Sequence, residues 1–599
     1  MTNSKLDVLN RTFGFSRFRP GQEEPIDALL AGKDVFCVMP TGAGKSLIYQ
    51  VPALVASGLT IVISPLIALM QDQVDALKLV GVNAEALNSS RDYQENLAIW
   101  SSAKAGKTRL LYMAPERLMS DGMLDRLKTM NISLIAIDEA HCISQWGPSF
   151  RPEYALLTDL KTHFPSVPVL ALTASADEAT RHDIANKLYT GDVETFVAGF
   201  DRPNISLAVE PKVNWKSQLS AFVTKFPDES GIVYCTSRKQ TEEAANFLVN
   251  EGHKALPYHA GLPSDVRGNH QTRFVREPGL IMTATIAFGM GIDKPDVRFV
   301  FHTGLASSME AYYQEFGRAG RDGELAAAHM LYGLDDIRLR RHFIESDGRQ
   351  EIDKRREHKR LDALIAFCES PTCRRQSLLA YFGDDSGPCK NCDICLNPVE
   401  LVEGTREGQM VLSAIARTGQ RFGPAHIIDV LLGAKTARLL QLGHDKLVTY
   451  GVGSEHVKPQ WQSIIRQLIA TGFVHLDIAQ YGGLSITDKG RQLLKGEAEF
   501  KYRAESLKPV AGSKRAKSVR AEQSMSQGDS ALYERLKGLR SELAKAKNVP
   551  AYVILHDRTL RQIATDRPET RIELSKIHGM GEAKLEKFGE VIIELTSGF

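Results

Sequence analysis

Short apolar segments alternate with longer amphipathic segments along this chain, and this alternation restricts the possible folds more than any other feature. The apolar segments occupy residues 34–39, 59–64, 108–113, 133–138 and 167–173, and the pattern restarts at 230–235, 278–284 and 297–303. Continuous apolar runs of this length are typical of buried parallel strands, and the stretches between them of crossover helices. The sequence therefore predicts an α/β fold with two parallel-sheet lobes in tandem.

The length and composition indicate a soluble protein of several domains. The chain has 599 residues, which is too long for a single hydrophobic core. Of these residues, 43% are hydrophobic and 24% are charged, as in a soluble globular protein. No apolar run approaches the roughly 20 residues of a membrane span, and the first residues lack a signal-peptide core, so we expect a cytoplasmic protein without a membrane partner. Because the net charge is only +2, a nucleic-acid surface has to be a local patch.

The segment PTGAGKS (residues 40–46) has the features of a phosphate-binding loop. It lies between the apolar segment 34–39 and a helical segment. In such a turn the backbone N–H groups surround the phosphates of a nucleotide at a helix N-terminus. The residues expected to do so are Thr41, Gly42 and Gly44. Lys45 is expected to reach the β- and γ-phosphates and the Ser46 hydroxyl to bind Mg²⁺. Met39 occupies the first glycine position of the strict pattern, so a chance glycine-rich turn is the alternative.

Two carboxylates, Asp138 and Glu139, stand at the end of the apolar segment 133–138. The carboxyl ends of parallel strands form the binding edge of an α/β sheet. We expect Asp138 to hold Mg²⁺ and Glu139 to orient and polarise the water that attacks the nucleotide. Such a pair is otherwise an ordinary helix start, but its place about 90 residues after a phosphate loop favours a catalytic function.

The second lobe supplies QEFGRAGRDG (residues 314–323), which carries Arg318 and Arg321. Three residues apart, they are expected to share one helical face and to point together into a cleft. The planar guanidinium matches phosphate oxygens bidentately, so either can act as an arginine finger, with Arg321 preferred. Surface salt bridges are the alternative.

Four of the eight cysteines lie within residues 373–395. In a reducing compartment such a cluster favours a metal over disulfides. Four thiolates complete a closed tetrahedral Zn²⁺ site, which is structural because no ligand position stays open. The expected ligands are Cys373, Cys389, Cys392 and Cys395. An iron–sulfur cluster is the alternative.

Taken together, PTGAGKS, DEAH (138–141) and QEFGRAGRDG resemble the motifs of superfamily-two helicases. FGFSRFRPGQ (13–22), DEAHCISQWGPSFRPEY (138–154) and ATIAFGMGIDKPDVRFV (284–300) narrow the resemblance to the RecQ family of DNA helicases, along about residues 8–599. The resemblance implies that ATP binds between two RecA-like lobes. It also implies that Cys373, rather than Cys368, belongs to the metal site.

The same resemblance assigns further nucleotide contacts. Gln22 is expected to read the adenine edge, since its amide can form a paired hydrogen bond with adenine. Phe15 and Arg19 are expected to flank the adenine ring. In the second lobe, Asp293 and Gln314 are expected to lie at the nucleotide.

The segment that follows the carboxylates is expected to couple ATP to DNA. Trp146, Phe150 and Arg151 lie in a proline-broken loop, and aromatic rings beside a basic side chain can stack on bases. For Tyr154 in the same segment, packing between the lobes is the favoured interpretation.

The sequence departs from the family pattern at two places. Pro148 and Ser149 stand where RecQ proteins usually have His-Asp, and Ser175 stands where threonine is usual. A serine keeps the hydroxyl, whereas proline cannot replace an imidazole. We expect DNA-stimulated ATP turnover with altered coupling, which a Pro148→His variant tests.

The C-terminal segments resemble two auxiliary modules. Residues 405–495 resemble a RecQ winged-helix domain, with a helix at 460–472 and a hairpin whose turn is expected at Gly482-Gly483. Tyr481 is expected near the hairpin tip. It either presses on the end of a DNA duplex or is an exposed loop residue without such a role. Residues 528–599 resemble the helical domain shared by helicases and ribonuclease D (HRDC). Its basic side chains either bind DNA or form a solvated helix face.

Six segments are therefore predicted, four of them domains or lobes, one a subdomain and one a linker. They are a first RecA-like lobe (1–203), a second (204–340), a helical zinc-binding subdomain (341–404), a winged-helix domain (405–505), a basic linker (506–527) and a small all-α HRDC-type domain (528–599).

The resemblance implies an ATP-dependent DNA helicase that moves 3′ to 5′ on single-stranded DNA and unwinds duplexes in recombination, replication and repair, including the SOS response. It implies a nucleoid-associated monomer, with single-stranded DNA-binding protein and topoisomerase as candidate partners. An RNA helicase, and an ATP-gated DNA-binding or strand-annealing protein that does not unwind, are the alternatives.

Overall fold

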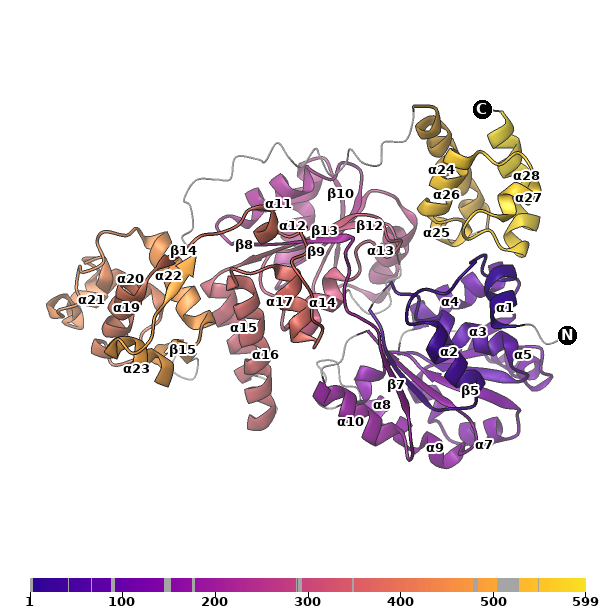
Figure 1. Cartoon of the computed structure of the whole chain (residues 1–599), viewed down its shortest axis with the longest axis horizontal. Helices are drawn as coiled ribbons and strands as arrows, with labels where there is room; N and C mark the ends of the chain where they lie inside the picture. Colours follow the sequence, from indigo (N-terminus) through magenta and orange to yellow (C-terminus); the bar gives the residue numbers. More distant parts are fainter. Residues whose placement is uncertain are drawn as a thin grey trace.

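The structure is a computed structural model. It describes residues 4–40, 42–65, 67–87, 92–144, 152–174, 178–286, 288, 294–346, 350–477, 483–503, 527–547 and 549–598. The second α/β lobe lies in the middle of the molecule, between the first lobe and the orange domain that contains α19 (Thr405–Arg417) to α23 (Asp488–Lys495) (Figure 1). The yellow helices at the C-terminus, α24 (Gln527–Lys547) to α28 (Glu582–Ser597), lie beside the first lobe. The predicted fold class is confirmed. None of the described helices combines the length and apolar character needed to cross a membrane.

The first lobe is built on a seven-stranded parallel sheet with the order β3-β4-β2-β5-β6-β1-β7. Its strands are β1 (Val35–Val38), β2 (Leu59–Ile63), β3 (Ala84–Leu87), β4 (Leu110–Met113), β5 (Ile132–Ile137), β6 (Val169–Thr173) and β7 (Glu194–Val197). Phe36 and Val38 belong to one hydrophobic cluster, and Val35 and Cys37 to another. Because side chains alternate along a strand, both faces of the sheet are covered, which explains the continuous apolar runs.

Helices cover both faces of this sheet. They are α1 (Lys5–Arg11), α2 (Glu23–Leu30), α3 (Leu47–Val55), α4 (Ile67–Leu79), α5 (Tyr93–Lys104), α6 (Pro115–Leu118), α7 (Met123–Lys128), η1 (Ala140–Ile143), α8 (Pro152–Ala155), η2 (Leu156–Asp159), α9 (Leu160–His163) and α10 (Glu178–Leu188). Helix α1 begins with a capping box, in which the Ser4 hydroxyl accepts from the Asp7 N–H and the Asp7 carboxylate accepts from the Ser4 N–H.

The second lobe repeats the architecture with a six-stranded parallel sheet of order β10-β11-β9-β12-β13-β8. Its elements are β8 (Ile205–Pro211), α11 (Trp215–Val223), β9 (Ser230–Tyr234), α12 (Arg238–Asn250), β10 (Lys254–Tyr258), α13 (Ser264–Arg276), β11 (Leu280–Ala284), β12 (Val297–His302), α14 (Met309–Phe316) and β13 (Ala326–Tyr332). In β9, a Cβ atom on Gly231 would overlap the Phe299 ring of β12, so only glycine allows this close packing.

Two helical units follow the lobes. The cysteine-rich unit comprises α15 (Leu334–Ser346), α16 (Glu351–Glu369), α17 (Arg374–Tyr381) and α18 (Asp393–Leu396). The next unit comprises β14 (Leu401–Glu403), α19 (Thr405–Arg417), α20 (Pro424–Leu431), α21 (Ala437–Gln441), η3 (His444–Lys446), α22 (Lys458–Ala470), β15 (Val474–Asp477), β16 (Gly483–Ile486), α23 (Asp488–Lys495) and β17 (Lys501–Arg503).

The predicted hairpin forms, but its turn is placed differently. Strand β16 begins at Gly483, which pairs with Asp477 in the antiparallel ladder, so Gly483 belongs to the strand and not to the turn. Gly482 lies outside the described residues. The helix predicted at 460–472 corresponds to α22, which packs against α16, α19 and α20 and is mostly buried. This helix therefore belongs to the interior of the domain.

The last unit consists of α24 (Gln527–Lys547), α25 (Ala551–Ile554), α26 (Asp557–Asp566), α27 (Arg571–Ser575) and α28 (Glu582–Ser597). It packs against the first lobe, because Leu79 of α4 joins its hydrophobic cluster. The Gly579 N–H donates to the Gly14 carbonyl at 2.9 Å, and the Lys587 ammonium donates to the Leu79 carbonyl at 2.6 Å. Figure 1 shows these yellow helices beside α1 and α4.

Candidate functional site

The predicted phosphate loop connects β1 to α3 at the carboxyl edge of the first sheet. Gly42 (φ 81°) and Gly44 (φ 80°) adopt the left-handed backbone conformation that favours glycine. A Cβ atom on Gly44 would lie 2.6 Å from Nε2 of Gln22, so a side chain there would displace the Gln22 amide. Ser46 is the N-cap residue of α3. Thr41 lies outside the described residues.

Lys45 lies among the predicted catalytic carboxylates. Its Nζ donates to the Met39 carbonyl at 3.3 Å. Burial lowers the pKa of the Lys45 ammonium, while the negative charges of Glu139 and Asp138 act in the opposite direction. A buried ammonium in a glycine-rich loop at a helix N-terminus is suited to bind an anionic ligand such as a triphosphate.

Asp138 and Glu139 directly follow β5, as predicted. The Glu139 N–H donates to Oδ1 of Asp138 at 2.9 Å, and Glu139 has a left-handed backbone (φ 51°) that is rare outside glycine. Nδ1 of His141 lies 3.3 Å from the Glu139 carboxylate and 2.9 Å from the Thr173 hydroxyl at the end of β6. His141 therefore links Glu139 to a neighbouring strand. This contact was not predicted from the sequence, although the DEAH motif contains the histidine.

The pKa of Glu139 reflects cations from both lobes. Burial acts to raise this pKa, but the charges of His141, Lys45, Arg318 and Arg321 outweigh it and hold the pKa below its ordinary value. Arg318 and Arg321 of the second lobe are thus close enough to stabilise a carboxylate of the first. The structure brings these predicted residues together.

The prediction that Arg318 and Arg321 share one face of a helix is wrong. Helix α14 ends at Phe316, and Arg318 and Arg321 lie on the turns that follow it, where Gly320 has φ 56°. The turn brings the backbone of Arg321 to the phosphate loop, since a Cβ atom on Gly42 would lie 3.3 Å from Cα of Arg321. Gln314, predicted as a nucleotide contact, lies on α14 itself.

The guanidinium of Arg318 has an unused donor. Arg318 is 9% exposed, and within the described part of the chain its Nε has no hydrogen-bond acceptor. Buried polar groups in folded proteins are normally hydrogen-bonded, and an exception requires an explanation such as an absent ligand. A phosphate oxygen would satisfy this donor.

The residues expected at the adenine contact the phosphate loop. The Gln22 amide donates to the carbonyls of Ala43 and Gly44, both at 3.0 Å, and its oxygen accepts from the Arg19 N–H at 2.8 Å. The Arg19 guanidinium donates to the Gly42 carbonyl at 2.7 Å. Gln22 and Arg19 thus support the loop, and their contact with adenine stays a prediction.

Phe15 lies between the first lobe and the C-terminal helices. Its ring centroid is 4.9 Å from that of His578. Burial lowers the pKa of Arg19, and the charge of Arg558 adds to this shift. The C-terminal helices therefore reach the residues that flank the phosphate loop. The sequence did not predict this contact, because it joins segments more than five hundred residues apart.

Several predicted residues lie outside the described residues: Trp146, Phe150, Arg151, Asp293 and Tyr481, together with Pro148, Ser149 and Ser175 at the family departures. Tyr154 is fully buried, and its hydroxyl donates to the Asp138 carbonyl at 3.0 Å. Tyr154 is therefore a packing residue, as predicted, but this hydrogen bond lies within the first lobe and not between the lobes.

The cysteine tetrad predicted from sequence also comes together. The Sγ atoms of Cys373, Cys389, Cys392 and Cys395 all lie within 4.8 Å of one another. Sulfurs that share a tetrahedral Zn²⁺ at roughly 2.3 Å are about 3.8 Å apart, and those of Cys373 and Cys392 are 3.9 Å apart. Cys368 is buried but does not belong to the cluster.

Backbone N–H groups surround these sulfurs. The Cys389 N–H donates to Sγ of Cys373 at 3.3 Å, and the Cys395 and Arg374 N–H groups donate to Sγ of Cys392 at 3.4 Å. Burial acts to raise the pKa of the Cys373 thiol, but hydrogen bonds, led by those from the backbone N–H groups of Cys389 and Gln376, outweigh it and lower the pKa to about 7. Burial raises the pKa of Cys389 and of Cys392. At Cys373 the donors favour the thiolate, which is the form that binds zinc.

Comparison with known proteins agrees with this arrangement. Family models match in chain order: DEAD/DEAH box helicase at 19–184, helicase conserved C-terminal domain at 215–323, RecQ zinc-binding at 334–396, RQC domain at 398–510 and HRDC domain at 529–596. Among solved structures, the DEAD-box helicase Mss116 bound to ssRNA and UDP-BeF shares 16% identity with a TM-score of 0.46, over 62% of this chain and 87% of that chain.

Similarity to curated proteins extends over almost the whole chain. It is 42% identical to the ATP-dependent DNA helicase RecQ of Pasteurella multocida (strain Pm70), over 99% of this chain and 94% of that protein. It is 43% identical to the ATP-dependent DNA helicase RecQ of Haemophilus influenzae (strain ATCC 51907 / DSM 11121 / KW20 / Rd), over 98% and 95%. At this identity and coverage, the chain belongs to the RecQ family of helicases.

Proposed function

We propose that this protein is an ATP-dependent DNA helicase that moves 3′ to 5′ along single-stranded DNA and unwinds duplex or branched DNA. The main support for this proposal is that Lys45 and Glu139 of the first lobe lie close enough to Arg318 and Arg321 of the second for their charges to interact. A site shared by two lobes can convert nucleotide binding and hydrolysis into closing and opening of the cleft.

The residues of this interlobe site have separate roles in ATP hydrolysis. Lys45 binds the β- and γ-phosphates, and Ser46 and Asp138 would hold Mg²⁺, which would neutralise phosphate charge. Glu139, kept ionised by the surrounding cations, orients the attacking water. Arg321, with Arg318, stabilises the charge that develops on the transferred phosphoryl group.

Unwinding of a short duplex with a 3′ single-stranded tail tests the function. We expect strand separation that requires ATP and Mg²⁺, and no comparable separation with a 5′ tail. ATP hydrolysis should be stimulated by single-stranded DNA more strongly than by RNA of the same sequence. Stimulation by RNA alone would identify an RNA helicase, and annealing that persists in Lys45→Ala without any unwinding would identify a strand-annealing protein.

The cysteine tetrad is proposed to hold a structural Zn²⁺. Cys392→Ser should abolish binding of about one zinc per chain and lower the melting temperature, because the metal contributes on the order of 10 kcal/mol to local folding. Cys368→Ser is the matched control, since this buried cysteine lies outside the tetrad, and it should retain the zinc. Atomic emission and the visible absorption spectrum provide the measurement. Iron with a visible charge-transfer band would establish an iron–sulfur cluster instead.

A further inference from the structure

The segment that connects the two lobes is bonded directly to the loop that carries the candidate arginines. This linker segment (residues 200–204) lies between β7 and β8, and the arginine loop comprises residues 317–325. The Arg202 guanidinium donates to three carbonyl oxygens of the arginine loop at 2.8–3.0 Å, those of Gly317, Ala319 and Gly320. One planar, multiply donating cation thus fixes the first part of the loop, a task that the single ammonium of lysine cannot reproduce.

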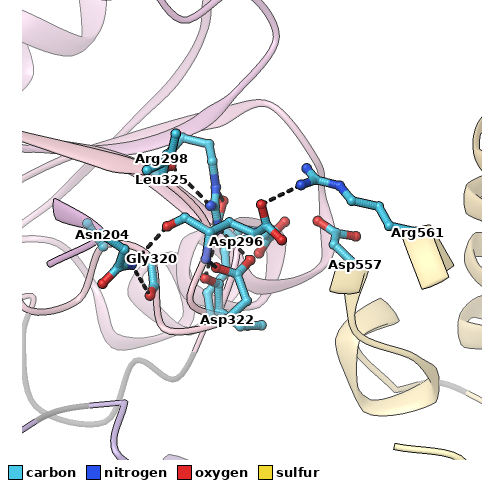
Figure 2. A network of polar contacts seen from close by, with 12 residues as sticks. Asn204, Asp296, Arg298, Gly320, Asp322, Leu325, Asp557 and Arg561 are labelled. Atoms are coloured by element: carbon cyan, nitrogen blue, oxygen red, sulfur yellow. Dashed lines mark hydrogen bonds and ion pairs between the residues drawn. The ribbon is translucent and has the colours of Figure 1, made fainter. Parts of the chain in front are cut away.

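Asn204 of the same segment makes a second attachment. Its Nδ2 donates to the carbonyls of Gly320 at 2.9 Å and Glu324 at 2.8 Å, and its own carbonyl accepts from the Ala326 N–H at 2.9 Å. A Cβ atom on Gly320 would overlap the Asn204 amide, so glycine permits this approach. Figure 2 shows Asn204 directed at Gly320.

The far part of the arginine loop is held by two other arginines. Arg298 of β12 pairs with Asp322 and donates to the Leu325 carbonyl at 3.3 Å. Arg561 of α26, from the C-terminal helices, pairs with Glu324. Figure 2 shows Arg561 approaching from the C-terminal unit, with Arg298 and Asp322 on the other side. Both parts of the arginine loop are therefore held by side chains from outside the loop.

The linker segment is itself anchored outside both sheets. The Phe200 N–H donates to the Asp384 carboxylate at 2.7 Å, and the Phe200 ring stacks on that of Phe382 with centroids 4.7 Å apart. Asp201 pairs with Arg375 at 2.7 Å. These partners belong to the zinc-binding subdomain, so the attachment point of Arg202 is fixed by packing and not by the linker alone.

The position of the arginine loop matters because Arg321 lies against the phosphate loop, where a Cβ on Gly42 would come within 3.3 Å of its Cα. A misplacement of about 1 Å at a reacting centre can reduce a rate about 10²-fold. We propose that Arg202 is a positioning residue for ATP hydrolysis, which holds the arginine loop so that Arg321 reaches the transferred phosphate. The proposal deepens the function proposed above and rests on it.

A double-mutant cycle tests the proposal with the full-length chain. In the wild-type background, Arg202→Ala should lower the kcat for ATP hydrolysis, at saturating single-stranded DNA, by about 10- to 100-fold and leave the affinity for a fluorescent ATP analogue within about threefold. In an Arg321→Ala background the same substitution should lower kcat much less, by less than about threefold, because Arg321 is already gone and only the smaller contribution of Arg318 is left to position. Arg273→Ala, which removes an exposed arginine of the same lobe, is the control and should have no effect.

A second variant keeps the test valid if the alanine variant folds poorly. Arg202→Lys retains the charge, but its donors leave a single nitrogen and cannot reproduce the contacts that Nη1 and Nη2 make with the three carbonyls, so it should show a similar loss of kcat. Equal losses of kcat in the wild-type and Arg321→Ala backgrounds would overturn the positioning role, as would an unchanged kcat in Arg202→Lys. If Arg321→Ala alone leaves kcat unchanged, the proposed role of Arg321 fails first. If only the Arg202 variants leave kcat unchanged, the further inference alone fails.

Discussion

Replacing Arg321 by alanine should reduce the kcat for ATP hydrolysis at saturating single-stranded DNA by about 10³-fold. Arg321 comes from the second lobe, yet its backbone touches Gly42 of the phosphate loop and its charge acts on Glu139. The expected loss corresponds to about 4 kcal/mol of transition-state stabilisation, within the range for an arginine finger. Affinity for ATP should change little, since the phosphate loop and Lys45 belong to the other lobe.

Two comparisons make this prediction specific. Arg321→Lys should restore only a small part of the rate, because an ammonium lacks the planar fork that binds two phosphate oxygens. Arg273→Ala removes an exposed arginine from the same lobe, one paired with Glu277, and should leave kcat unchanged. A kcat of Arg321→Ala within twofold of wild type would rule out the finger role, and a large loss in Arg318→Ala instead would assign the role to Arg318.

The features predicted well from sequence are those with a local physical cause. The strands of the first sheet near its centre, such as β2 and β5, are buried on both faces and therefore read as continuous apolar runs. Strands β3 (AEAL) and β7 (ETFV) were not predicted, because each is four residues long and carries polar side chains at a sheet edge. The cysteine spacing identified the tetrad because few other chemistries use such a spacing.

The features that sequence could not provide depend on contacts between distant segments. Helical periodicity placed Arg318 and Arg321 on one face, but α14 already ends at Phe316. The positive φ of Gly320 and its contact with Asn204 then shape the turn that carries the arginines. Likewise, nothing near Gly14 indicates its hydrogen bond with Gly579 of the C-terminal helices. Such long-range contacts decide where a side chain points, so residue roles at the interlobe site needed the three-dimensional arrangement.

Replacing Glu139 by glutamine should lower the kcat for ATP hydrolysis by about 10²- to 10⁴-fold while ATP still binds. Glutamine keeps the volume and can hydrogen-bond, but it cannot accept a proton from the attacking water. Because His141, Lys45 and the two arginines hold the pKa of Glu139 below its ordinary value against the effect of burial, the wild-type kcat should not decline through protonation of Glu139 at pH values down to the ordinary range of a glutamate. Glu277→Gln, on the exposed surface of the second lobe, is the matched control and should retain full activity. Rapid-quench measurement of a single turnover separates the chemical step from ATP binding, and a normal single-turnover rate in Glu139→Gln would remove Glu139 from the catalytic role.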